Sequence, residues 1–152
     1  MAAIDFPKQL PWPLQENYSL ETVDPMIRTS MVTGRSRRRI RHSYVPTYVS
    51  ASFIFNEAQA SFFEAWYART LGNGLEWFNC PLQTPEGTKP YEARFLQIYE
   101  GPVLVQLSFW RYSVRLELRR RPLMPEGWEQ FPDLWFGKSI IDLAINREWS
   151  KA

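Results

Sequence analysis

The chain has 152 residues, enough for one domain with extra segments at its ends. Its net charge is only +2, so a basic surface has to be local, and its single cysteine excludes an internal disulfide. Aromatic residues make up 16% of the chain, more than a small core needs, so we expect some of them to face partner proteins.

Residues 1–25 are predicted to form an extended N-terminal arm. Several prolines forbid a regular helix there, and apolar side chains such as Trp12 would anchor the arm on its own chain or on a neighbour's. Residues 27–32 then fit a short edge strand, which a turn at Thr33–Gly34 ends.

A run of five arginines and one histidine follows, within positions 35–42. It fits either a strand whose arginines point both ways or an exposed loop. Together with a second basic stretch at 115–121, it could form a phosphate-binding face. The alternative is a solvated face or a protein interface that meets Glu16, Glu21 and Asp24 of a neighbour. The nearly neutral net charge favours the interface.

A strand and a helix form the centre of the prediction. Apolar and polar side chains alternate over residues 47–55, the pattern of a half-buried strand. Asn56 fits a helix N-cap and Gln59 completes a capping box, so we expect a helix over about 57–71, ended by Gly72. Its apolar stripe is wide and aromatic, so the helix should lie across a sheet.

The rest of the domain is predicted to surround one long strand. Residues 110–118 alternate most regularly and place five apolar side chains on one face, as in a central strand, which Pro122 ends. Before it we expect a strand at 75–79, a loop at 81–90 with its turn at 85–87, a strand at 91–95, a turn at 100–102 and a strand at 103–107.

These elements predict a β-rich α+β fold: an antiparallel β-sandwich or barrel over residues 26–122, with one flanking helix. Extended arms at 1–25 and 123–152 complete the chain, and the second arm should carry a short helix over 140–149, capped by Ser139. The candidate core residues are Phe53, Phe55, Phe62, Trp66, Trp77, Trp110, Tyr112, Val114 and Leu116.

The sequence gives little support for catalysis. A thiol nucleophile at Cys80 would have only His42 as its base, and no known signature surrounds it. We therefore expect Cys80 to be a small buried hydrophobe and His42 an exposed loop residue. Because the chain has no Cys/His cluster and no glycine-rich phosphate loop, we expect no catalytic, metal-binding or cofactor-binding residue and no cofactor.

Several short segments occur in a recognisable order. They are the basic segment Gly34–Arg39, the sequence Phe55-Asn56-Glu57-Ala58 before a helix with Phe62-Phe63 and Trp66-Tyr67, the stretch Gly72–Phe78, and the strand Trp110–Leu118. Over about residues 33–122 the chain resembles the minor tail and distal tail proteins of long-tailed bacteriophages, in the group of the lambda minor tail protein M.

The resemblance implies a structural role without an active site. It implies a compact β-sandwich or barrel with a flanking helix, in a ring of six subunits that joins the tail tube to the tail tip or distal hub. The partners would be other copies of the chain and other tail proteins, with nucleic acid present only as DNA passing through a channel. The protein would be made in the cytoplasm of a bacterial host and reside in the virion tail. The long aromatic arms depart from the family's pattern and would serve contacts between subunits.

The candidate subunit-interface residues are the arginine run and apolar side chains of both arms: Arg35, Arg37, Arg38, Arg39, Arg41, Trp12, Trp128, Phe131, Trp135, Phe136, Ile140, Leu143 and Trp149. An alternative function is a nucleic-acid-binding module that uses the arginines at 35–41 with Tyr44 and Tyr48. An enzyme that uses Cys80 is the remaining alternative. We expect no membrane segment, because no apolar run approaches the length of a span, and no signal peptide.

Overall fold

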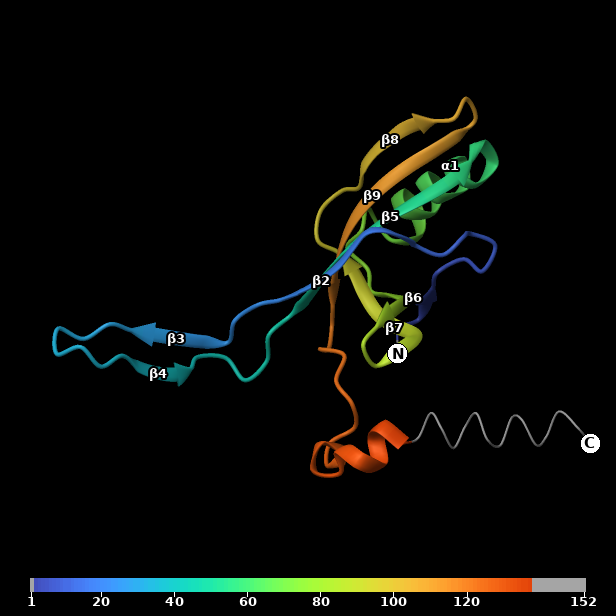
Figure 1. The fold of residues 1–152 in the computed structure, drawn as a ribbon. Coiled ribbons are helices and arrows are strands. Elements are labelled where there is room, and N and C mark those ends of the chain that lie inside the picture. Colours follow the sequence, from blue (N-terminus) through green and yellow to red (C-terminus); the bar gives the residue numbers. More distant parts are fainter. Residues whose placement is uncertain (1, 138–152) are drawn as a thin grey trace, which may run out of the picture. The chain divides into compact units, whose positions relative to one another are not determined.

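The computed structural model describes residues 2–137. The chain divides into two compact units, Met1–Arg121 and a second unit from Pro122, and each is described by itself. The first unit contains a mixed sheet of seven strands and one main helix (Figure 1). The predicted β-rich α+β class is confirmed, and the sheet is open and not closed into a barrel.

The strands follow one another along most of the first unit, with a single helical segment between β5 and β6. They are β1 (Ile4–Asp5), β2 (Leu14–Thr22), β3 (Met26–Thr29), β4 (Arg37–Ile40), β5 (Thr47–Asn56), β6 (Phe78–Thr84), β7 (Gly87–Phe95), β8 (Glu100–Val105) and β9 (Phe109–Leu118). The helical segment consists of α1 (Glu57–Ala65) and the π-helix η1 (Trp66–Thr70).

The large sheet has the order β1-β6-β7-β9-β5-β2, and β8 pairs with the other half of β9. β5 and β9 are antiparallel and pair along ten residues, from Thr47 opposite Leu118 to Asn56 opposite Phe109. The prediction of a central strand is therefore confirmed for β9, which β5 borders on one side and β7 and β8 on the other. β1 runs parallel to β6, so the sheet is mixed and not purely antiparallel.

The alternation in β5 and β9 decides which face is buried. Side chains at every second position share a face of a strand, and in both strands the apolar set is buried. The other face of β5 carries Tyr48, Ser50 and Ser52, as its sequence predicts. The buried apolar residues of these two strands are Val49, Ala51, Phe53, Phe55, Tyr112, Val114, Leu116 and Leu118.

The predicted helix covers this buried face (Figure 1). Its capping box is confirmed: the Gln59 amide donates to the Asn56 side chain at 2.8 Å, and the Asn56 amide donates to the Gln59 side chain at 3.1 Å. Gly72, with a φ of +54°, follows the helical segment in the left-handed conformation that glycine adopts most easily.

Phe63 is the centre of the core. It is fully buried, and its ring centroid lies 5.1 Å from those of Phe55 and Tyr112 and 5.5 Å from that of Tyr99. Further rings surround it at 6.2–6.5 Å, and they join the strands of both halves of the sheet to the helix. The core therefore depends on contacts between aromatic rings.

Two of the predicted core residues are wrong. Phe62 is 51% exposed, because one position along a helix turns a side chain by about 100° and Phe63 takes the inward place. Trp77 is half-buried and lies outside the core, with the guanidinium groups of Arg94 and Arg119 4.7 and 5.8 Å from its ring. Trp110 is partly buried at the edge of the core, and the other predicted core residues are buried in it.

Some predicted turns and loops are strands. The loop expected at 81–90 is the hairpin of β6 and β7, in which Pro81 lies opposite Pro90. Because neither proline has an N–H to donate, this opposed pair is one that exchanges no backbone hydrogen bond, and both prolines lie outside the stretches that pair with β1 and β9. The turn expected at 100–102 likewise belongs to a strand, β8, in which the register shifts before Val103. The strand expected from residue 75 begins later, because β6 starts at Phe78.

The N-terminal stretch is extended, as predicted, but it is part of the sheet and not a separate arm. β1 pairs with β6 and β2 pairs with β5, while Phe6 and Leu10 are buried in the core. The Phe6 ring stacks on Phe53 at 5.6 Å. The sequence left open whether the N-terminal apolar side chains cover their own chain or a neighbour's. In the structure Phe6 and Leu10 pack on their own chain.

The second unit begins with an irregular, proline-containing stretch. A 3-10 turn, η2 (Trp128–Gln130), follows, and residues 132–137 are helical. The rings of Trp128 and Trp135 pack together at 5.8 Å. The helix predicted over 140–149 lies outside the described residues.

Candidate assembly surfaces

Residues 23–46 form a long β-hairpin, which we call the Arg hairpin. The chain leaves the large sheet after Thr22 and returns to it at Thr47, directly opposite. Between these points β3 and β4 make a two-stranded sheet of their own, which Figure 1 shows continuing beyond the ends of β2 and β5. Three arginines of the run, Arg37, Arg38 and Arg39, thus lie in a strand and occupy both of its faces, as one of the two predicted forms has it, while Arg35 and Arg41 lie outside the strand.

Local hydrogen bonds fix the base and the tip of the Arg hairpin. At the base the Asp24 carboxylate accepts from the Met26 amide at 2.9 Å, and the Arg41 amide donates to the Pro25 carbonyl at 2.8 Å. At the tip the amide of Gly34, which has a φ of +82°, donates to a backbone carbonyl at 3.2 Å. No arginine side chain takes part in these bonds, which involve backbone groups and the Asp24 carboxylate.

The Arg hairpin carries unneutralised positive charge. It contains six arginines and one carboxylate, Asp24. The six arginines are exposed, and within residues 2–137 none of them forms an ion pair: Arg28, Arg35, Arg37, Arg38, Arg39 and Arg41.

The arginines of β9 differ, because carboxylates of the same chain already neutralise them. Arg115 pairs with Glu21 at 2.8 Å, and Arg111 pairs with Glu16 at 3.3 Å, both reaching across β5 to β2. The sequence-based interpretation that these two glutamates serve a neighbour's arginines is therefore wrong. Arg119 is likewise 3.5 Å from a carboxylate oxygen of its own chain. Of the four arginines of the second basic stretch, Arg115 and Arg119 are thus paired within the fold, while no ion pair joins Arg120 or Arg121 to another residue of 2–137.

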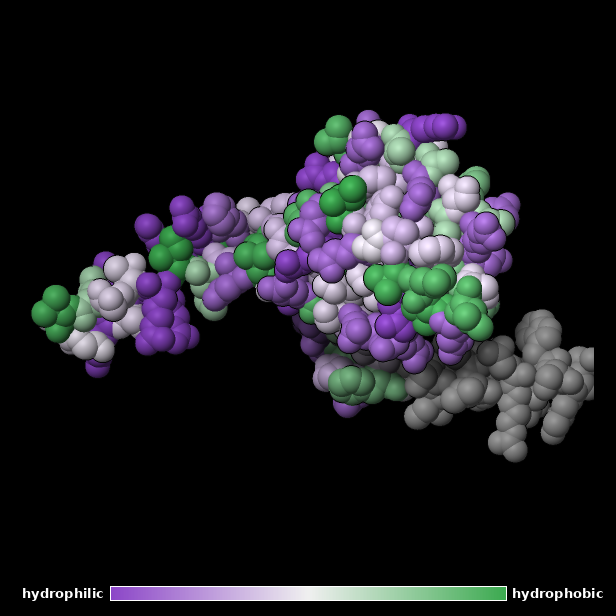
Figure 2. Space-filling model, turned by 90° about the horizontal axis from the view of Figure 1, so that it is seen from above, coloured by the Kyte–Doolittle hydropathy of each residue, from purple (hydrophilic) through white to green (hydrophobic). Residues whose placement is uncertain are grey.

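A second exposed surface lies at the turn between β8 and β9, and we call it the β8–β9 patch. Its members are apolar side chains exposed by 42–98%: Val103, Leu104, Leu107 and Phe109. An open groove of ≈ 850 Å³ separates this turn from the first turn of α1. Figure 1 shows the turn at the top of the first unit, and the view from above in Figure 2 shows a group of hydrophobic side chains. Surfaces of this kind are typical of protein interfaces.

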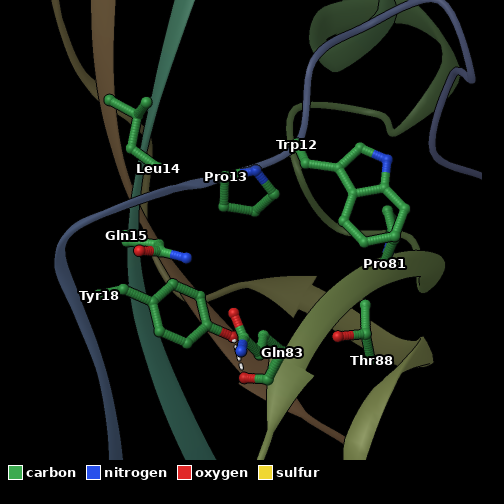
Figure 3. A pocket seen from close by; sticks show the side chains of 8 residues that line it. All are labelled: Trp12, Pro13, Leu14, Gln15, Tyr18, Pro81, Gln83 and Thr88. Carbon is green, nitrogen blue, oxygen red and sulfur yellow. Dashed lines mark hydrogen bonds between the residues drawn. The ribbon is translucent and has the colours of Figure 1, made fainter.

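A third feature is a pocket of ≈ 360 Å³ between β2 and the β6–β7 hairpin (Figure 3). Trp12 and Tyr18 lie on its two sides, and the Tyr18 hydroxyl donates to the Gln83 carbonyl at 2.7 Å. Burial raises the pKa of Tyr18 to about 12, so it remains a neutral donor near pH 7. None of the residues that line the pocket is a carboxylate, histidine, cysteine or basic residue, so the pocket offers apolar and hydrogen-bonding contacts but no acid or base.

Cys80 and His42, the two residues considered for a thiol nucleophile and its base, differ in their exposure to solvent. Cys80 is fully buried in β6, and burial raises the pKa of its thiol, so it stays protonated. His42 is exposed in the Arg hairpin. Among residues 2–137 no group of three His, Cys, Asp or Glu side chains could hold a metal ion. Cys80 and His42 thus lie in different surroundings, one inside the core and the other on the surface of the Arg hairpin.

The predicted interface residues in the described part of the chain lie at the surface. All five arginines of the run are exposed, as are Trp12, Trp128, Phe131 and Phe136, while Trp135 is half-buried. Ile140, Leu143 and Trp149 lie outside the described residues. The sequence prediction missed Arg28 and the β8–β9 patch. Arg28 is separated from the other arginines of the Arg hairpin in the sequence. The pairing of β3 with β4 places it opposite Arg38 of the run.

No protein-family model, curated protein or solved structure matches the chain. No helix in the described part is long and apolar enough to cross a membrane.

Proposed function

We propose that the chain is a structural subunit of a bacteriophage tail, forming a ring that joins the tail tube to the tail tip or distal hub. One observation carries the proposal: six arginines without an ion pair among residues 2–137 and a group of exposed apolar side chains lie on projecting elements, while the arginines of the large sheet's strands pair with carboxylates of the same chain. The Arg hairpin and the β8–β9 patch are the clearest of these elements. Arginine and large apolar side chains are enriched where proteins meet.

A heterologous contact, in which one surface of each subunit meets a different surface of the next, forms a ring when the rotation between neighbouring subunits closes on the first one. The Arg hairpin and the aromatic segment from residue 122 are different surfaces of this kind. Six subunits are the expected number, with other tail proteins on the two faces of the ring and DNA passing through its channel. The role requires no catalysis, so the protein would be no enzyme and would reside in the virion tail.

Removal of residues 123–152 tests the proposal. The core residues all belong to the first unit, so the shortened chain should retain its β-sheet circular dichroism and a cooperative unfolding transition. Its self-association, measured by sedimentation, should be weaker than that of the full chain. If the shortened chain assembles as the full chain does, the proposed role of the C-terminal arm is wrong.

A nucleic-acid-binding module is the second candidate, and the geometry of the Arg hairpin favours it. A two-stranded ribbon can enter the major groove of a duplex, and here arginines occupy both of its faces. Binding through them would weaken steeply with salt, with a slope close to the number of phosphates neutralised. Titration of a labelled duplex and a labelled single strand at 50 and 200 mM salt tests this candidate. Absent or salt-independent binding would remove it.

A further inference from the structure

The register of the Arg hairpin gives its two faces different compositions. Met26 lies opposite Ile40, and Arg28 lies opposite Arg38. Residues directly opposite each other, and residues two positions apart, share a face of a ribbon. These four side chains therefore form one surface, which we call the Arg28–Arg38 face. The other face carries Arg37 and Arg39 opposite Thr29 and Ile27.

The Arg28–Arg38 face is unfavourable when it is left in water. Like charges directly opposite each other destabilise a strand pair, and a two-stranded ribbon has little stability of its own. Within residues 2–137 neither arginine has a carboxylate partner. Beside them Met26 and Ile40 are 49% and 72% exposed. A binding partner for this face has to supply carboxylates and apolar surface together.

The chain itself contains a segment with this chemistry. Residues 122–137 include the carboxylates of Glu126, Glu129 and Asp133 and no basic residue. Trp128 and Phe131, which lie between these carboxylates in the sequence, are 44% and 54% exposed. The segment is therefore both acidic and aromatic, and it complements the Arg28–Arg38 face in charge and in hydrophobicity.

We propose that the Arg28–Arg38 face of one subunit binds residues 122–137 of a second copy of the chain. The proposal rests on the proposed function, since it names one of the contacts that would close the ring. Carboxylates pair with guanidinium groups through two parallel hydrogen bonds, and aromatic rings stack on guanidinium planes and cover aliphatic side chains. A nucleic-acid backbone would neutralise the arginines but would leave Met26 and Ile40 in water, so the observations favour the protein segment.

Charge reversal in the full chain tests the proposal. The face variant is Arg28→Glu/Arg38→Glu, and its matched control is Arg37→Glu/Arg39→Glu, which makes the same change of charge on the opposite face of the Arg hairpin. The segment variant is Glu126→Lys/Glu129→Lys. Self-association constants are measured by sedimentation at low salt, with circular dichroism as the check on folding.

The face variant and the segment variant should each weaken self-association about tenfold or more, and the control less than about threefold. A chain that carries both reversals should recover the wild-type constant to within about threefold. An equimolar mixture of the face variant and the segment variant should also assemble, because every contact between unlike chains again joins opposite charges.

Several results would overturn the proposal. If the face variant and the control weaken assembly equally, the effect is one of net charge and not of this face. If the chain with both reversals recovers the wild-type self-association constant but the mixture of the face variant and the segment variant does not assemble, residues 122–137 bind the Arg28–Arg38 face of their own chain. If the face variant loses binding to a DNA duplex while its self-association is unchanged, the partner is nucleic acid. Wild-type chains that never associate would contradict the proposed function as well, whereas wild-type assembly that both reversals leave intact would contradict this contact alone.

Discussion

Replacement of Phe63 tests whether the aromatic cluster is the centre of the fold. The side chain is fully buried and packs against rings from β5, β9 and the residues around them. Truncation of a buried phenylalanine to alanine costs about 3–5 kcal/mol of unfolding free energy, because apolar contact is lost and a cavity remains. We expect about 4 kcal/mol for Phe63→Ala, a large part of the 5–15 kcal/mol that domains typically have. Phe63→Leu, which removes fewer carbon atoms, should cost about 2 kcal/mol and remain folded.

The neighbouring Phe62 provides the matched control, because it is the same residue type in the same helix but is 51% exposed. Phe62→Ala should cost about 1 kcal/mol or less. Urea unfolding followed by circular dichroism measures all three variants. With a slope of about 2 kcal/mol per molar urea, the midpoint should fall by about 2 M for Phe63→Ala and about 0.5 M for Phe62→Ala. An equal or larger shift for Phe62→Ala would refute the assignment of the inward face of α1.

Other predictions follow from the cap, the buried thiol and the buried tyrosines. Asn56→Ala should lower the unfolding free energy by about 1 kcal/mol and Asn56→Asp by much less, because aspartate still accepts the capping bond; equal losses in urea unfolding would contradict the cap. The thiol of Cys80 should react with a disulfide reagent only after unfolding, and rapid labelling of the native chain would show that it is accessible. Burial raises the pKa of Tyr18 to about 12, and burial with the hydrogen bond to Glu64 raises that of Tyr112. Both folded values lie above the unfolded value of about 10. Their stabilisation is therefore complete below pH 10 and is lost as the pH rises through the folded pKa, which is about 12 for Tyr18, so the urea midpoint should fall above pH 10; a midpoint that stays constant from pH 9 to 12 would contradict it.

The predictions that succeeded rest on local physical signals. The alternation in β5 and β9 identifies a buried face because a strand has a period of two, and the capping box at Asn56 fixes where α1 begins. The choice between Phe62 and Phe63 failed because both residues lie within the wide apolar stripe, and only the position of the sheet decides which one turns inward. Pro81 and Pro90 suggested a loop because the sequence does not reveal which backbone groups have a neighbouring strand.

The candidate surfaces were predictable only in part. The exposure of the arginine run follows from its composition, and the turn at Gly34 between two strand-like stretches is a local signal for a hairpin. The opposition of Arg28 and Arg38 depends on register, which composition does not set. The pairing of Arg115 with Glu21 joins residues 94 positions apart, so a neighbour's glutamate and the chain's own were equivalent candidates until the sheet order was known.

The most direct test of the central claim, that this chain is a ring-forming structural subunit, is the native mass of the full chain over a wide range of concentration, with electron micrographs of the large species. The account predicts closed rings of a single size whose mass is a fixed multiple of the chain's 18.0 kDa, six being the expected number. A chain that remains monomeric at every concentration, or that forms only open aggregates of variable size, would contradict it.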